Sequence, residues 1–299
     1  MPELPEVETT ARLLRPLLTG RTIAAVQHLD YPPLVAPFSP EAFRSAVAGR
    51  QILAVGRRAK YILLSLDDGF TLTIHLGMSG TLFVAPQAAP ADRHTRAILD
   101  LDHGRGLRFC DPRKFGRMRL LSPAQYGRLD ARLGPEPLDS ADDESGWTAR
   151  LRRRSRARLK PLLMDQRFLA GLGNIYADEA LHRAGLHPLR PAGSLSDEEA
   201  SRLLRAVIEV LSAAVTAQGT TLPDGAYRFG EGEHGRFAER LRVYGRAGEP
   251  CPTCGHPIGR ERIGGRSSHF CPRCQPIGDG DPVRSPSTAA RHSPRPVVE

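Results

Sequence analysis

Four cysteines near the carboxyl end constrain the fold more than any other feature of this sequence. They form two Cys-x-x-Cys pairs with sixteen residues between them: Cys251, Cys254, Cys271 and Cys274. Two such pairs at this distance are typical of a site that holds one Zn²⁺ ion tetrahedrally. Four thiolates leave no open coordination position, so the predicted role of the ion is structural. We expect the nearby His256 and His269 to be surface residues or phosphate contacts rather than ligands.

The segment between the two pairs, RERIGGRSSHF, is basic and has two glycines at its centre. It is too short to build a core of its own, so the metal is expected to hold it as a hairpin. A hairpin tipped by arginine suits a nucleic-acid groove.

The charge of the whole chain also favours a nucleic-acid partner. Lys and Arg number 42 against 33 Asp and Glu, which gives a formal net charge of +9 and a pI of about 9.8. Guanidinium is the preferred group for phosphate recognition, so a polyanionic partner is predicted. On charge alone, the alternative is a soluble protein that is rich in arginine but has no polyanionic partner.

Other features exclude two classes of protein. The sequence has no run of about 18 apolar residues and no signal or transit peptide, so membrane-spanning and exported proteins are disfavoured. The fifth cysteine, Cys110, has no partner in the pattern and is interpreted as a buried small hydrophobe, which argues against a disulfide framework. The expected location is the cytoplasm, with association to the nucleoid where the polyanionic partner is DNA.

The first half of the chain reads as a helix followed by strands. A helical apolar face includes Val7 and Leu14, and Gly20 is placed to end the helix. Strand-like segments separated by turn residues follow at 22–29, 51–66, 70–80, 81–85, 96–102, 106–111 and 117–122. This spacing predicts an antiparallel β-sandwich rather than alternating βα units.

The second half reads as helical. A polar, acidic segment, residues 134–148, is predicted to link an amino-terminal domain (1–133) to a helical domain (149–245). Residues 160–188 predict helix, glycine turn and helix, with Asn174 as a candidate cap of the second helix. Ser196 and Glu199 form a capping box before a long apolar stripe that Gly219 ends. The zinc finger is placed at 246–275 and a disordered tail at 276–299.

The amino terminus, MPELPEVE, has two interpretations. Proline and glutamates suit the first turn of a helix. Alternatively, loss of Met1 would leave Pro2 with a free secondary amine that can act as a nucleophile.

Five motifs in order decide between them. These are PELPEVE, RRAKY, HLGMSG, DPRKFG, and GLGNIYADE followed by the cysteine hairpin. From Pro2 to about Gln275, the chain resembles the formamidopyrimidine-DNA glycosylases, bifunctional base-excision repair enzymes. The resemblance implies an α+β multidomain fold. An N-terminal helix and β-sandwich precede a helix–two-turn–helix domain and a zinc finger, and DNA lies between the domains.

The resemblance also implies the catalytic roles. Pro2 would be the nucleophile that attacks the deoxyribose, and Glu3 would transfer protons. Lys60, expected on a strand entering the cleft, would assist base loss and β-elimination. Arg266 would bind phosphate and promote δ-elimination. Glu6 would contact the damaged base, although its interpretation as a helix-dipole acid stays open.

The remaining roles concern DNA. Met78, Arg113 and Phe115 match the three residues that fill the void left by an extruded nucleotide. The alternative is that Met78 is core and Phe115 a packed strand residue. Further phosphate contacts are implied for a larger set: Asn174, Lys160, His94, Arg156, Lys114, His75 and Tyr244.

The implied enzyme is a DNA glycosylase and abasic-site lyase for oxidised purines in double-stranded DNA, acting as a monomer with one structural Zn²⁺. Three alternatives remain: an endonuclease VIII-like preference for oxidised pyrimidines, a non-catalytic damage-binding protein, and a zinc-ribbon translation or transcription factor, which fits the cysteines but not the amino terminus. The lesion-covering loop, Thr220–Phe237, carries Pro223, Gly225 and Ala226 in a variable region, which leaves the base preference open.

Overall fold

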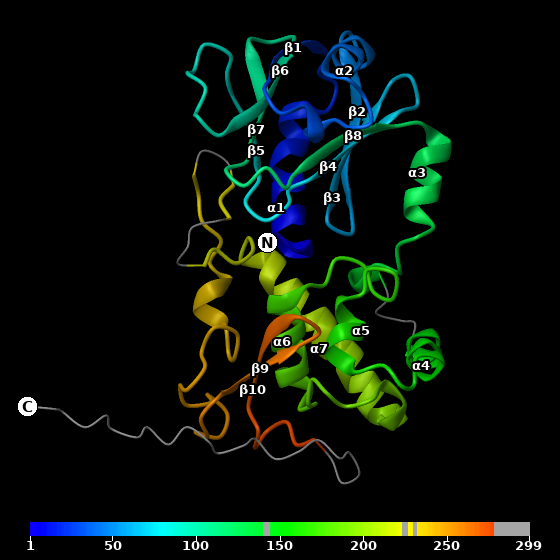
Figure 1. Ribbon diagram of the computed structural model, residues 1–299, viewed down its shortest axis with the longest axis vertical. Coiled ribbons are helices and arrows are strands. Elements are labelled where there is room, and N and C mark those ends of the chain that lie inside the picture. The colour runs from blue at the N-terminus through cyan, green and yellow to red at the C-terminus, as the bar shows by residue number, and fades with distance from the viewer. Residues whose placement is uncertain (140–143, 223–226, 230–231, 278–299) are drawn as a thin grey trace, which may run out of the picture.

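The structure is a computed structural model that describes residues 1–139, 144–222, 227–229 and 232–277. The chain forms a β-rich half and a helical half, and its amino terminus lies between the two (Figure 1). This arrangement confirms the predicted order of helix, sandwich, helical domain and cysteine hairpin. The positions Pro223, Gly225 and Ala226, and residues 278–299 of the predicted tail, lie outside the described residues.

Helix α1 (Leu4–Leu18) begins with a reciprocal cap. The Glu3 side chain accepts from the N3 backbone, and the Glu6 side chain accepts the Glu3 backbone N–H at 2.8 Å. The helix ends at Leu18, and Gly20 follows at φ +79°, a conformation that glycine adopts without strain. The apolar face of α1, which includes Val7 and Leu14, packs into the core of the sandwich.

The sandwich consists of two four-stranded antiparallel sheets. In spatial order, one contains β1 (Ile23–Leu29), β6 (Thr95–Leu101), β7 (Arg105–Cys110) and β5 (Thr81–Pro86). The other contains β2 (Ile52–Arg58), β3 (Tyr61–Leu66), β4 (Thr71–His75) and β8 (Arg117–Leu121). Successive side chains of a strand point to opposite faces of the sheet, which explains the packing. Along β3, every second residue is buried, with Ile62, Leu64 and Leu66 in the core.

Two helices of this half were not predicted. Helix α2 (Pro40–Val47) follows the cap Ser39, and α3 (Pro123–Asp130) follows Ser122. Both have serine before proline, a start signal for a helix, but each has only eight residues, so the apolar period is short.

The helical half contains α4 (Glu144–Arg153), α5 (Leu159–Met164), α6 (Asn174–Ala184) and α7 (Asp197–Thr216). The predicted helix, glycine turn and helix are confirmed as α5 and α6, and the capping box of Ser196 and Glu199 is confirmed at α7. The predicted linker is not without structure, because α4 begins inside it at Glu144; residues 140–143 are not described.

The cysteine module contains a two-stranded hairpin of β9 (Gly259–Ile263) and β10 (Arg266–Phe270). Gly264 and Gly265 form the turn, with φ +56° and +77°. Four 3₁₀ turns complete the assignment of the described residues: η1 (Pro32–Leu34), η2 (Pro137–Asp139), η3 (Ala192–Ser194) and η4 (Phe237–Arg240). Within the described ranges, no helix has the length and apolar character needed to cross a membrane.

Candidate active site

The first turn of α1 lies at the junction of the two halves (Figure 1). The Leu4 N–H donates to the carbonyl of Gly171, in the loop before α6, at 3.0 Å. Gly171 has φ +84°, and a Cβ there would lie 2.8 Å from Leu4 Cβ, so the close approach requires glycine. Pro2 is buried at this junction. The predicted nucleophile therefore lies where both domains meet.

Glu3 is buried beside Pro2 and held by α6. One carboxylate oxygen accepts the Ile175 N–H at 2.9 Å, in the first turn of α6, and the other has no hydrogen-bond partner among the described residues. Burial raises the pKa of Glu3 to about 7, and the charge of Lys60 opposes the shift. A carboxyl that titrates near neutrality can act as both acid and base at physiological pH.

Contrary to the prediction, Lys60 lies not on a strand but in the two-residue turn between β2 and β3. Ala59, the other turn residue, has φ +51°, and its N–H donates to Glu136 at 2.6 Å. Lys60 is only 6% exposed. Burial lowers its pKa, which Glu3 and Glu6 oppose and the charge of Arg266 reinforces. The charges of Glu3 and Arg266 thus act on the Lys60 ammonium in opposite directions.

Glu6 is more than a helix-dipole acid. Its carboxylate accepts from the backbone N–H of Thr220 (2.7 Å), from the Glu3 N–H, and from the Tyr176 hydroxyl. Burial raises its pKa. Glu6 thus connects α1 to α6 and to the start of the predicted lesion-covering loop, and it lines a small pocket with Pro2, Ile175 and Tyr227.

The three predicted void-filling residues lie on two adjacent loops of the sandwich. Phe115 is 51% exposed, and the Arg113 guanidinium lies 5.2 Å from its ring centroid. Met78, partly buried, lies on the neighbouring β4–β5 loop. Aromatic and arginine side chains are enriched where proteins contact their partners, and the exposed pair fits such a role.

Asp111, which sequence reasoning missed, holds these loops together. Its buried carboxylate accepts from the Ser79 hydroxyl (2.7 Å) and from the backbone N–H groups of Arg113 (3.1 Å) and Gly116 (2.8 Å). The signal that could have indicated it is the Asp-Pro pair after a strand, typical of a side chain that accepts hydrogen bonds from the following turn.

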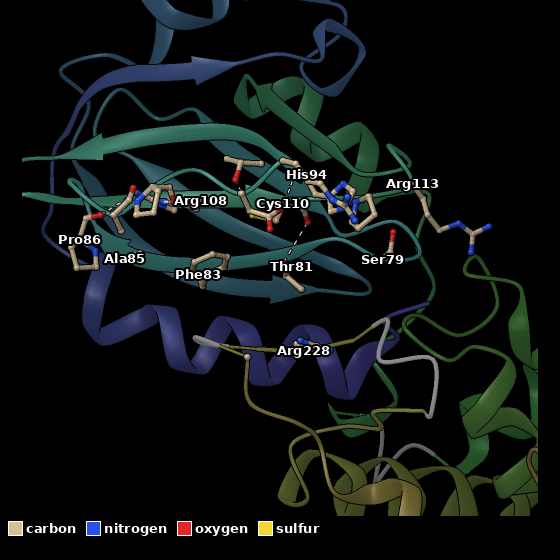
Figure 2. Close-up of a pocket in the computed structure, with 17 residues that line it drawn as sticks. Ser79, Thr81, Phe83, Ala85, Pro86, His94, Arg108, Cys110, Arg113 and Arg228 are labelled. Carbon is tan, nitrogen blue, oxygen red and sulfur yellow. Dashed lines mark hydrogen bonds between the residues drawn. The ribbon is translucent and has the colours of Figure 1, made fainter.

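A cavity of about 940 Å³ extends from these loops across the sheet (Figure 2). Its lining includes Ser79, His94, Cys110, Arg113 and Arg228. Figure 2 labels Arg228, which comes from the segment after α7 and belongs to the same lining. Cys110 is partly exposed in this lining rather than buried as predicted. Arginine and histidine around an open cavity next to the interdomain junction suit phosphate or base contacts.

The other predicted phosphate contacts differ in their surroundings. Arg156 and Lys114 are exposed, and the Lys114 ammonium lies 5.2 Å from the Tyr31 ring centroid. His75 accepts the Gly77 N–H at its Nδ1 (3.1 Å), and burial lowers its pKa to about 4, so its ring is neutral at physiological pH. Tyr244 is partly buried on the helical half.

Three further sequence predictions require correction. Asn174 is not the cap of α6; Gly173 takes that position, because a side chain there would meet Glu3, with a Cβ only 2.3 Å from the carboxyl carbon. Lys160 does not reach solvent, as a phosphate contact would require, since its ammonium is buried 2.6 Å from Asp178. His269 is buried too, with its backbone N–H donating to Asp178.

The four cysteines form the predicted metal site. Their sulfurs all lie within 4.8 Å of one another, with Cys254 to Cys271 at 3.4 Å and Cys251 to Cys274 at 3.9 Å. A tetrahedral Zn²⁺ with four thiolates requires sulfur separations of about 3.8 Å, so the donor set fits. His182 lies outside this set, with its Nε2 3.4 Å from the Cys251 sulfur, where it can hydrogen-bond to a thiolate.

Tyr176 and Thr220 are two further residues of the site that sequence reasoning missed. They bond to Glu6 and to each other, with their hydroxyl oxygens 2.8 Å apart. No local pattern indicates these contacts, because the two residues are separated from Glu6 by 170 and 214 positions.

Sequence profiles match most of the chain. The Formamidopyrimidine-DNA glycosylase N-terminal domain matches residues 1–118, the H2TH domain of the same enzymes matches 133–224, and the zinc finger found in FPG and IleRS matches 248–277.

Full-length relatives agree. Formamidopyrimidine-DNA glycosylase of Chloroflexus aurantiacus is 50% identical over 92% of this chain and 98% of its own length, and that of Thermus thermophilus is 49% identical over 94% and 100%. The crystal structure of MutM (Fpg) from Thermus thermophilus superposes with a TM-score of 0.82, 48% identity and coverage of 93% of this chain and 100% of that one. Lactococcus lactis Fpg in complex with DNA containing an abasic site gives 0.84, with 34% identity and coverage of 92% and 99%. With these identities over nearly its whole length, the chain belongs to the formamidopyrimidine-DNA glycosylase family.

Proposed function

We propose that this enzyme removes oxidised purines, chiefly 8-oxoguanine and formamidopyrimidines, from double-stranded DNA and then cuts the abasic sugar on both sides. The observation that carries the proposal is the burial of Glu3 beside Pro2 at the domain junction, with its pKa raised to about 7 and the charge of the buried Lys60 acting on it. A protein that only bound DNA would have no need for a carboxyl shifted to neutrality next to an amino terminus.

The proposed reaction begins at Pro2 after removal of Met1. An α-amine titrates at about 7.7–8.0, so part of it is unprotonated at neutral pH. Protonated Glu3 gives its proton to the ring oxygen as the C1′–O4′ bond breaks and the Pro2 nitrogen forms a bond to C1′ of the deoxyribose. The nitrogen then loses its proton to the base, and its lone pair forms the C=N bond as the glycosidic bond breaks, with the electron pair of that bond leaving on the base. The product is an iminium ion between Pro2 and the opened sugar.

The iminium ion accepts electrons, which permits both cuts. Loss of a C2′ proton to a base releases the 3′ phosphate in β-elimination, and loss of a C4′ proton releases the 5′ phosphate in δ-elimination. We assign the first step to Glu3 and Lys60 and phosphate contact in the second to Arg266. The electrostatic influence of Arg266 on Lys60 supports this, because both cations must act on one sugar.

DNA recognition is assigned to the surfaces that flank this pocket. Met78, Arg113 and Phe115 would fill the void of the extruded nucleotide, and Glu6 would contact the lesion. The neighbours' titles support DNA as the substrate: one Lactococcus lactis complex contains Fapy-dG DNA and others contain abasic-site DNA. The zinc ion would have only a structural role, because four thiolates complete its coordination.

We also propose the division into domains at 1–133, 149–245 and 246–275, with a monomer as the active form. The profile matches at 1–118, 133–224 and 248–277 support similar limits. Because the substrate would be chromosomal DNA, the enzyme would act at the nucleoid, in the cytoplasm.

The test is to trap the iminium ion. Untagged protein, with loss of Met1 checked by mass spectrometry, is mixed with a duplex carrying one 8-oxoguanine opposite cytosine, and borohydride is added. A covalent adduct at Pro2 is expected. A tag on the amino terminus should abolish the adduct, and the same tag on the carboxyl terminus should not. An adduct with oxidised pyrimidines but not purines would favour the endonuclease VIII-like alternative. Binding without any adduct, even on a plain abasic site, would refute the enzymatic proposal.

A further inference from the structure

We propose that Asp178 positions the zinc hairpin at the catalytic pocket, by fixing β10 to helices α5 and α6 next to Arg266. Three buried side chains form this contact: Lys160, Asp178 and His269, here called the hairpin joint. The inference rests on the proposed role of Arg266 in δ-elimination. It gives Lys160 a function other than the phosphate contact predicted from the sequence.

The carboxylate of Asp178 faces two different elements. Its Oδ1 lies 2.6 Å from the ammonium of Lys160 on α5. Its Oδ2 accepts the backbone N–H of His269 on β10 at 2.9 Å and lies 3.3 Å from the His269 ring nitrogen Nδ1. One side chain on α6 therefore connects both helices to the hairpin.

Lys160 provides the second hydrogen bond between the hairpin joint and the backbone of β10. Its ammonium, which has no exposed surface, also donates to the carbonyl of Ser267 at 2.9 Å. Ser267 directly follows Arg266 in β10. The carbonyl of Ser267 and the N–H of His269 are thus both fixed within three residues of Arg266, so the joint sets where the arginine side chain begins.

Packing shields the joint from water. The Tyr244 ring lies edge-on to His269, with centroids 5.1 Å apart, and the His187 and Phe270 rings are 4.4 Å apart. At the turn, a Cβ on Gly264 would lie 3.3 Å from Pro161 of α5, so the hairpin lies directly against that helix. Charged hydrogen bonds are strengthened where water is excluded, which makes the geometry of the joint stiff.

The hairpin end is within electrostatic reach of the catalytic residues. The charge of Arg266 acts on Lys60, and that of Glu3 acts on Lys160. Displacement of a reacting group by about 1 Å can reduce a rate about a hundredfold. A small shift of β10 is therefore enough to remove Arg266 from its phosphate without unfolding the domain.

The buried charges favour a positioning role over a stabilising one. A buried ion pair can often be replaced by apolar side chains without loss of stability, because desolvation offsets the attraction. What an apolar pair cannot supply is two directed bonds to the backbone of β10. The joint is thus suited to fix the place of the hairpin.

The experiment compares Asp178→Asn with the parent on a duplex containing an abasic site. Arg266→Ala serves as the positive reference, and Glu209→Gln as the matched control. Glu209 pairs with Arg183 on the exposed surface of the same helical domain. Each protein is assayed for bound zinc, melting temperature, borohydride adduct, and the ratio of β,δ- to β-elimination products.

For Asp178→Asn, we expect full zinc content, an adduct yield within about twofold of the parent, and a fall in the δ-product fraction of about tenfold, as for Arg266→Ala. Glu209→Gln should match the parent. If Asp178→Asn does not fold, Lys160→Met/Asp178→Asn removes both charges together and should give the same shift in products.

Three outcomes separate the claims. A folded, zinc-loaded variant with the parent's product ratio would overturn the positioning role. A variant that loses zinc and adduct together would also overturn it, in favour of a purely structural joint. No adduct with the parent protein would instead refute the proposed function.

Discussion

At the residue scale, the shifted pKa of Glu3 predicts how activity depends on pH. Proton donation needs the protonated carboxyl, and the pKa is raised to about 7, so the rate of base release should fall as pH rises through that value. Attack by Pro2 needs the free amine, so the rate should also fall at acidic pH. Glu3→Gln, which cannot transfer a proton, should lower the single-turnover rate by about 10²–10⁴-fold and lose the alkaline limb. Rapid-quench kinetics on an 8-oxoguanine duplex, at pH values on either side of 7, measure the single-turnover rate and its pH dependence for the parent and for Glu3→Gln. An unchanged alkaline limb in the variant would contradict the assignment of Glu3 as the proton donor.

A glycine beside Glu3 gives a steric prediction. A Cβ at Gly173 would lie 2.3 Å from the Glu3 carboxyl carbon, so Gly173→Ala must displace the Glu3 side chain. We expect loss of base release by about a hundredfold or more. Gly127→Ala is the control: its Cβ would meet no atom within 4 Å, and alanine in helix α3 should add about 0.5–1 kcal/mol of stability. Single-turnover rates and melting curves of the two variants test this prediction. Base release by Gly173→Ala at the parent's rate would contradict it, because it would show that the Glu3 carboxyl can move without loss of activity.

Three of the residues that sequence reasoning misplaced share one physical feature. Lys160, Asn174 and His269 are polar side chains whose surroundings come from other parts of the chain. A lysine before a helix or an asparagine before an apolar run carries a surface signal in sequence. The partner of His269 lies 91 positions away, however, and no local pattern indicates that pairing. The metal site of the four cysteines was predictable because its motif is local and its chemistry is specific.

At the element scale, the contacts of Asp111 predict that the two loops proposed to fill the void act as one unit. Asp111→Ala would leave the Ser79 hydroxyl and the N–H groups of Arg113 and Gly116 without their acceptor, at about 1–3 kcal/mol for each buried group. Extrusion of the nucleotide should fail, whereas the adduct with an abasic site in single-stranded DNA should persist.

Fluorescence of 2-aminopurine opposite the lesion measures the extrusion. Asp68→Asn is the matched control, because Asp68 also accepts a backbone N–H, that of Phe70 at 3.0 Å, in a loop of the same domain. Normal extrusion by a folded Asp111→Ala protein would contradict the role.

Elements were predictable where their period was long and their ends were marked. Helix α7, with its capping box and apolar stripe, matches the prediction, whereas the strand-like run 51–66 proved to be two strands joined at Ala59 and Lys60. No glycine, proline or asparagine marks that turn. Glu136, 77 residues away, holds it instead through the Ala59 N–H.

At the scale of the whole molecule, the zinc site couples the hairpin to the helical domain. Chelation should unfold the cysteine module, since it has only a small core of its own around Val243, Ile258 and two cysteines. Loss of zinc should therefore remove the contact of Arg266 and reduce δ-elimination first, while the sandwich, with its independent core, stays folded. Circular dichroism and product ratios during titration with a chelator check whether the cysteine module unfolds and δ-elimination falls before the sandwich unfolds. Simultaneous unfolding of the cysteine module and the sandwich would contradict the prediction.

The distribution of arginines predicts which face of the molecule carries the DNA. Arg156, before α5, and Arg205, on α7, are both exposed arginines of the helical half, but only Arg156 is assigned to phosphate; Arg205 pairs with Glu144 at 3.1 Å. Each phosphate contact contributes about 0.9 to the slope of log K against log salt concentration. Arg156→Ala should therefore lower the slope by about 1, uniformly across sequences, and Arg205→Ala should leave it unchanged. Fluorescence anisotropy of a labelled duplex at several salt concentrations distinguishes the two variants, and equal slopes would contradict the assignment of Arg156 to a phosphate.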